Sequence, residues 1–240
     1  ADKAEMLSLD PKSIRKIDFI DNPGVRYGDG IAYVIDITTR RADNGYTLGT
    51  SLTQALTTRD GDYTVYGKWN TGKSELSLNY SFGYRDFKGI RTEETAHYHL
   101  NEGSIYTIQR NDLASRNRSL SNQMKLTYNL ADSSRYVFQA SLSGDFSHVP
   151  GDFSQKQIVD GAQMYTALEQ QQSQSSSPVL DLYYFQQFTP RQSLTLNAVG
   201  TYIGTQSSDS YDEGSPYRYN VDGRTYSLLS EAIYENRLKP

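Results

Sequence analysis

Strict alternation of apolar and polar residues is the feature that most limits what this chain can fold into. The alternation runs from about Tyr46 to Asn236 in segments of about ten residues. Segment 75–85 is the clearest case, because one parity holds only Leu76, Leu78, Tyr80, Phe82 and Tyr84. Successive side chains of a β-strand point to opposite faces, so the pattern predicts two-faced strands rather than helices.

The connections between these segments alternate between short and long. Short links fall at 71–73, 131–134 and 189–192, and long polar links fall at about 88–115, 150–176 and 207–223. One short link, Arg59–Gly61, falls on the side where the others are long. Short turns at one end and long loops at the other are typical of transmembrane β-barrels. We expect about eight antiparallel up-and-down strands, with an additional short hairpin as an option near 104–110.

A soluble β-sandwich also alternates, so two further observations separate the alternatives. The apolar faces of segments 75–85, 119–130 and 135–147 contain no charged residue, whereas the opposite faces carry Glu75, Arg85, Lys125, Arg135 and Asp145. Aromatic residues of the apolar faces lie at the two strand ends: Tyr46, Trp69, Tyr128, Tyr136 and Tyr234 at one, and Tyr63, Tyr84, Phe146, Tyr202 and Tyr226 at the other. Two aromatic belts around an aliphatic middle favour a lipid-facing surface. A soluble β fold is the alternative.

Composition excludes several classes of function for the 240-residue chain. Its net charge of −4 gives no reason to expect nucleic-acid binding. The absence of cysteine excludes a disulfide framework and a thiolate metal site. Mean hydropathy is −0.67, and no run of about 18 apolar residues exists, which excludes helical membrane spans.

Motifs for chemistry are weak. Residues 67–74 match the phosphate-binding pattern G-x-x-x-x-G-K-S, but the pattern needs a following helix, and we expect a hairpin turn at Thr71–Lys73 instead. His97 and His99 share one strand face, and Asp209, Asp212 and Glu213 form an acidic loop, but solvated loops are the simpler interpretation of both. No nucleophile and base pair is found, so we predict no enzyme, no metal and no cofactor. Six tyrosines of the long links suit ligand contact: Tyr98, Tyr106, Tyr165, Tyr211, Tyr217 and Tyr219.

Residues 1–41 form a different, α+β unit. Asp10-Pro11 predicts a short helical turn, 17–20 and 31–39 predict two strands, and Asn22-Pro23-Gly24 predicts a turn between them. The unit is too small to bury a core of its own. We therefore divide the chain into 1–41 and an incomplete barrel over 42–240.

The segment from Ile17 to Arg40 resembles the end of the plug domain of TonB-dependent outer-membrane receptors, in particular those of Bacteroidetes. The resemblance rests on Asn22, Pro23, Gly24, Arg26, Tyr27 and Gly28, followed by the strand Val34–Thr39 and then by alternating strands. Asp36 stands where Asn is common in that family, a minor departure.

The resemblance implies a 22-stranded barrel in the outer membrane of a Gram-negative bacterium, closed by a plug. It also implies active import of a small solute, with outer-membrane lipid, TonB and a surface lipoprotein as partners, although the ligand cannot be read from the sequence. The TonB box and most of the plug are not in this sequence, and no export signal is visible, so we expect a fragment. A passive or structural outer-membrane barrel (a porin or an adhesin) and a soluble β-rich binding domain are the alternative functions.

Overall fold

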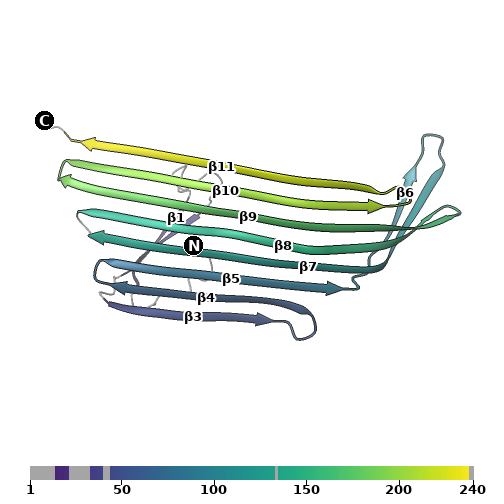
Figure 1. Cartoon of the computed structure of the whole chain (residues 1–240), viewed down its shortest axis with the longest axis horizontal. Coiled ribbons are helices and arrows are strands. Elements are labelled where there is room, and N and C mark those ends of the chain that lie inside the picture. The colour runs from purple at the N-terminus through teal and green to yellow at the C-terminus, as the bar shows by residue number, and fades with distance from the viewer. Residues whose placement is uncertain (1–13, 22–32, 40–43, 133–134, 238–240) are drawn as a thin grey trace.

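The computed structural model describes residues 14–21, 33–39, 44–132 and 135–237, and all regular elements in these ranges are strands. The first three are β1 (Ile14–Asp21), β2 (Tyr33–Thr39) and β3 (Asn44–Gln54). The remaining strands are β4 (Arg59–Thr71), β5 (Ser74–Lys88), β6 (Glu93–His99), β7 (Ile105–Asp132), β8 (Tyr136–Asp160), β9 (Gln163–Thr189), β10 (Gln192–Asp212) and β11 (Tyr217–Asn236). Figure 1 shows most of these strands running side by side along the long axis of the molecule.

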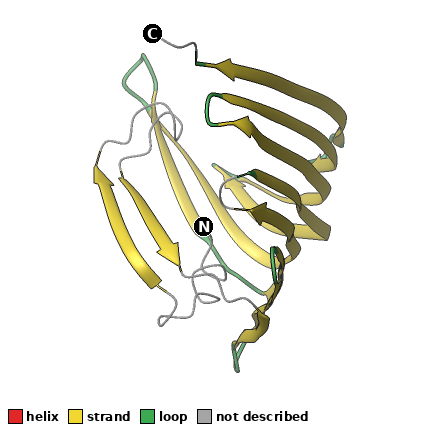
Figure 2. Cartoon of the chain, turned by 90° about the vertical axis from the view of Figure 1, so that its left-hand side faces the viewer, coloured by secondary structure: helices red, strands yellow, loops and turns green. Residues whose placement is uncertain are grey.

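A single nine-stranded antiparallel sheet contains all strands from β3 onward. Its order is β11-β10-β9-β8-β7-β5-β4-β3, and β6 pairs with the first part of β7. The prediction of an up-and-down antiparallel sheet of about eight strands with an extra hairpin is confirmed. The sheet is not closed, because β3 and β11 are its two edges. It curls strongly, as Figure 2 shows.

The strands β1 and β2 form a separate antiparallel hairpin, which lies on the side toward which the large sheet curls (Figure 2). The rings of Phe19 and Tyr33 contact across it in a tilted arrangement, with centroids 5.2 Å apart. The two strands predicted at 17–20 and 31–39 are therefore confirmed in their described parts. The helical turn predicted at Asp10 and the turn motif Asn22, Pro23, Gly24, Arg26, Tyr27 and Gly28 lie outside the described residues.

The long links expected at 88–115, 150–176 and 207–223 are wrong, because most of these residues extend the strands. β7, β8 and β9 continue far beyond the predicted segments and pair with one another almost to their tips. The glutamine- and serine-rich tract 169–177 lies inside β9, and all six tyrosines assigned to long loops lie in strands. These segments are polar on both faces, which hides the alternation, while pairing on both sides satisfies their backbone groups. The connections that remain turn at Gly103, Gly161 and Gly214, which all have positive φ.

The first hairpins of the sheet test two of the predicted turns. The turn predicted at Arg59–Gly61 is wrong, because β4 begins at Arg59 and the link lies at 55–58. The turn predicted between β4 and β5 is confirmed, with Gly72 at a φ of 52°. A strand follows Ser74 instead of a helix, so the N–H groups that would hold a phosphate in G-x-x-x-x-G-K-S are absent there.

The described part of the chain buries almost no apolar side chains. Among the described residues, Ile158 and Ala167 are the only buried apolar side chains. The accessible surface is 17179 Å², whereas a compact monomer of 27.1 kDa is expected to have about 10,900 Å². Both faces of the large sheet are therefore left uncovered over much of its area.

Candidate functional site

One face of the large sheet is a continuous apolar surface. Directly paired residues lie on the same face of a sheet, so the register assigns each side chain to a face. Leu78 pairs with Leu126, Leu126 with Leu142, and Leu142 with Leu180, which places four leucines in one row across four strands. Each of these side chains is exposed, as are Leu48, Leu52, Val65, Leu196 and Leu228. We call this the apolar band.

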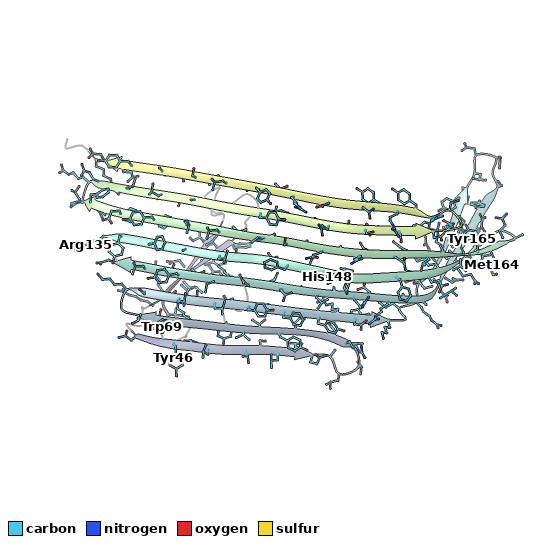
Figure 3. The ribbon with its side chains drawn as sticks, in the orientation of Figure 1. Tyr46, Trp69, Arg135, His148, Met164 and Tyr165 are labelled. Atoms are coloured by element: carbon cyan, nitrogen blue, oxygen red, sulfur yellow. The ribbon has the colours of Figure 1, made fainter. Side chains whose placement is uncertain are left out.

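Aromatic side chains border the apolar band at both ends, as predicted. Figure 3 shows Tyr46 and Trp69 near the end of the sheet with the short turns, whereas Met164 and Tyr165 lie at the opposite, distal end. The distal aromatic row contains Tyr63, Tyr84, Phe146, Tyr202 and Tyr226, as predicted. The turn-side aromatic row contains Tyr46, Trp69, Tyr128, Phe138 and Tyr234, in which Phe138 replaces the predicted Tyr136, two residues nearer the turn on the same face of β8. Several rings contact across strands, including Tyr202 and Tyr226 with centroids 4.9 Å apart.

The two aromatic rows are parallel to each other but oblique to the strands. The register connects Tyr84 on β5, through its direct partners on each successive strand, to Asp222 on β11. The aromatic residue of β11, Tyr226, lies four residues after Asp222, toward the end with the short turns. The register connects Trp69 in the same way to Ser230, four residues short of Tyr234. From β5 to β11, the distal row is therefore displaced by about 13 Å along the strand direction over about 24 Å of sheet width, which corresponds to an angle of about 30°.

Two parallel aromatic rows that are oblique to the strands are expected where tilted strands cross a layer of constant thickness. The aromatic residues are eight positions apart on β8 (138 to 146) and again on β11 (226 to 234). Eight residues tilted by about 30° span roughly 23 Å, close to the height of about 25 Å of the outward band of membrane barrels. The slope is also close to the usual strand tilt in such barrels, about 35–45°.

The opposite face of the sheet is polar and hydrogen-bonded across strands. Thr64 and Ser81 contact through their hydroxyl oxygens at 2.9 Å, and Ser147 and Ser175 do so at 2.7 Å. Thr127 and Ser141 are buried and lie 3.3 Å apart. Small hydroxyl side chains therefore form ladders on this polar face, whose accessible groups suit contact with water.

The charged residues assigned to this face have mixed outcomes. Lys68 Nζ lies 2.9 Å from Glu75, and Asn129 donates to the same carboxylate at 3.3 Å. Arg85 pairs with Asp60 at 3.2 Å on the polar face, whereas Arg135 lies in the turn before β8 and not on a strand.

A cluster of cations that the sequence analysis did not single out lies on the apolar side, just beyond the distal aromatic row. We call Arg59, Lys88, Arg116 and Arg118 the cation cluster. Its centre is Asp86, whose side chain is fully buried and accepts hydrogen bonds from Arg116 Nε and Nη2, each at 2.9 Å. Arg59 Nη1 lies 3.5 Å from the same carboxylate. One indication of the cluster was present in the sequence. On β5, every second residue from Leu76 to Tyr84 is uncharged, and the next two residues of the same face, Asp86 and Lys88, are charged.

A bulge in β8 anchors the fourth member of this cluster. The β8–β9 register shifts between Val149 and Asp152, and Gly151 has a φ of 123°. Arg118 donates from Nη2 to the Gly151 carbonyl at 2.9 Å, and its backbone N–H donates to Asp152 at 2.6 Å. The extra residue reverses which parity of β8 faces each side of the sheet beyond the bulge.

Tyrosines and charged residues form a network at the distal end. The rings of Tyr98 and Tyr106 contact in a tilted arrangement with centroids 6.1 Å apart, and Tyr211 donates to Glu213 at 2.7 Å. Hydrogen bonding to Asp160 raises the pKa of Tyr106 to about 12. Burial and the bond to Glu213 raise the pKa of Tyr211 to about 12 as well. These bonds therefore stabilise the distal end below the ordinary tyrosine pKa, and that stabilisation is lost as the pH rises toward 12.

The tyrosine network includes four of the six tyrosines that the sequence singled out. Hydrogen bonds to Tyr211 and Tyr165 lower the pKa of Glu213, and Tyr98 raises the pKa of Arg110. Tyr217 and Tyr219 lie on β11 with exposed rings. The network flanks Ile158, which is one of the two apolar side chains buried within the described residues, because Ile158 pairs in register with both Arg110 and Tyr165.

The candidate metal ligands do not form a site. His97 Nδ1 contacts Thr107 Oγ1 at 2.9 Å. Over residues 14–21, 33–39, 44–132 and 135–237, no three His, Cys, Asp or Glu side chains converge in a way that could hold an ion. The same ranges contain no helix long and apolar enough to cross a membrane.

Comparison with known proteins adds no neighbour. No protein-family model matches the chain, and no curated protein or solved structure matches it either.

Proposed function

We propose that this chain forms part of the barrel of an outer-membrane receptor that imports a solute. The observation that supports a membrane barrel best is the apolar band with its two parallel, oblique aromatic rows. Such a surface costs free energy in water, at about 25 cal/mol per Å² of exposed apolar area, and is stabilised by hydrocarbon. The polar face opposite suits a water-filled interior.

The receptor function is supported by the resemblance of residues 17–40 to the end of a TonB-dependent plug. A passive or structural barrel gives no reason for such a segment before the first barrel strand. In this proposal the hairpin of β1 and β2 belongs to the plug, TonB supplies the energy, and the charged groups of the polar face line the route of the solute. No covalent chemistry is required, so the proposed protein is a transporter and not an enzyme.

The only tryptophan of the chain provides a direct test of the membrane assignment. Trp69 lies in the turn-side aromatic row with 56% of its surface exposed. In phosphatidylcholine vesicles we expect its fluorescence to shift to the blue. We also expect stronger quenching by lipids brominated near the headgroup than by lipids brominated near the end of the acyl chain, because tryptophan favours the interface.

A water-soluble quencher provides the control for that experiment. Iodide should quench Trp69 much less in vesicles than after unfolding in urea. If instead the chain stays monodisperse in plain buffer, and brominated lipids leave Trp69 unquenched, the chain is a soluble β-rich domain and the proposed function is wrong.

A further inference from the structure

We infer that the cation cluster binds the phosphate of an anionic lipid headgroup at the membrane surface. This inference rests on the proposed function and adds a lipid partner to it. It is carried by the position of the cluster, by its charge balance and by the way Asp86 holds it.

The position of the cluster matches the headgroup layer. Asp86 and Lys88 follow Tyr84 by two and four residues on the same face of β5. They therefore lie about 7 and about 13 Å farther along the strand, or about 6 and about 11 Å above the distal aromatic row at a tilt of about 30°. The polar layer of a bilayer extends roughly 5–8 Å beyond each side of the hydrocarbon. Asp86, Arg59 and Arg118 therefore leave the sheet within this layer. Lys88 and Arg116 leave it just beyond the layer, and the Arg116 guanidinium reaches back to Asp86.

The charge balance of the cluster is positive. Arg59 pairs in register with Asp86, Asp86 with Arg118, and Lys88 with Arg116, so all five groups share one face. Asp86 neutralises one of the four cations, and its side chain is fully shielded from solvent. The Arg59 side chain remains 69% exposed, and Lys88 is exposed as well. Asp152 is a second carboxylate at the cluster, because it accepts the backbone N–H of Arg118 at 2.6 Å. The cluster therefore has two net positive charges, and its exposed members Arg59 and Lys88 are accessible to an anion that approaches from the lipid side.

The buried carboxylate gives the cluster a fixed geometry. Arg116 is held by two hydrogen bonds to Asp86, and Arg118 by the carbonyls of the β8 bulge. The Nε group of Arg118 is shielded from solvent and has no hydrogen-bond partner within the described part of the chain. Guanidinium groups match the planar, multidentate geometry of phosphate oxygens, and their preorientation reduces the entropy lost on binding.

The test uses a fluorescent reporter next to the cluster. The chain carries Trp69→Phe and Phe82→Trp, so that its single tryptophan lies on the same face as Tyr84 and two residues before it. It is reconstituted in phosphatidylcholine vesicles that contain a minor fraction of either brominated phosphatidylglycerol or brominated phosphatidylcholine. The ratio of the two quenching efficiencies measures the preference for the anionic headgroup.

We expect a preference of at least about fivefold for phosphatidylglycerol, because each basic residue near a membrane surface contributes about that factor. Arg59→Gln and Lys88→Gln should each lower the ratio, since both leave the Asp86–Arg116 pair in place. Arg85→Gln is the matched control: it removes a cation one residue from Asp86, but on the polar face, and should leave the ratio unchanged. Added salt should reduce the ratio through screening.

The other outcomes separate this inference from the proposed function. Equal quenching by the two lipids, or a preference that survives Arg59→Gln and Lys88→Gln together, overturns the lipid site and leaves the membrane assignment intact. Loss of the preference with inorganic phosphate, but not with sodium chloride of equal ionic strength, means that the cluster binds free phosphate and not lipid. Absence of quenching by either lipid contradicts the proposed function itself.

Discussion

Leu142→Arg lowers the free energy of unfolding of the membrane-inserted chain by about 2–4 kcal/mol, if the apolar band contacts hydrocarbon. Leu142 is midway between Phe138 and Phe146 on β8, so the variant places a cation at the centre of the band. Its row neighbours Leu126 and Leu180 offer no counter-charge. Equilibrium urea unfolding in phosphatidylcholine vesicles measures the change.

A matched arginine on the polar face provides the control for Leu142→Arg. Gln123→Arg adds the same side chain to β7, opposite Asp145 and exposed on the polar face. We expect a change within about 0.5 kcal/mol, as for an ordinary surface substitution. Equal costs for the two variants would mean that both faces meet the same environment, which contradicts the assignment.

Asp86→Ala is expected to cause the second large loss of stability. The carboxylate is fully buried and binds Arg116 at two positions, Arg59 at 3.5 Å and the Tyr84 hydroxyl at 3.4 Å. Its removal leaves the partly buried guanidinium of Arg116 without this partner and takes away the carboxylate that lies between Arg116 and Arg59, and both effects are unfavourable. The urea midpoint of Asp86→Ala should fall clearly below that of the parent chain.

The exposed ion pair of Asp60 and Arg85 is the reference for that change. Its two side chains are 34% and 55% exposed, so Asp60→Ala removes a solvated pair and should hardly move the urea midpoint. A further variant, Asp86→Ala with Arg116→Met, should recover part of the loss because it removes the unpaired charge. If Asp86→Ala behaves like Asp60→Ala, the carboxylate does not organise the cation cluster.

Sequence reasoning was most successful where one face of a strand is apolar. In β5 and in the first half of β8, a one-residue slip would exchange the leucines for serines, so composition fixes both the face and the register. The aromatic residues at the strand ends could be recognised for the same reason. The oblique course of the two rows could not, because it depends on the stagger between strands, which no single segment encodes.

Sequence reasoning failed where both faces of a strand are polar. The tract Gln170–Ser177 has the composition of a loop, yet it is held by β8 on one side and β10 on the other. Asp86 and Arg116 are 30 residues apart, and only the pairing of β5 with β7 brings them together. The tyrosine network likewise depends on three hairpins whose ends meet, so its members could be named from the sequence but their partners could not.

Site-directed spin labelling along β8 tests the central claim most directly, because the natural chain has no cysteine to remove. Cysteines are introduced one at a time at positions 138 to 146, labelled with a nitroxide and reconstituted in vesicles. Collision rates are then measured with oxygen, which concentrates in lipid, and with a water-soluble nickel complex. We predict a period of two residues, with oxygen dominant at even positions, nickel dominant at odd positions, and the highest oxygen rate at position 142. Nickel access at even and odd positions alike, or protection of the even positions from both reagents, would contradict a lipid-facing band.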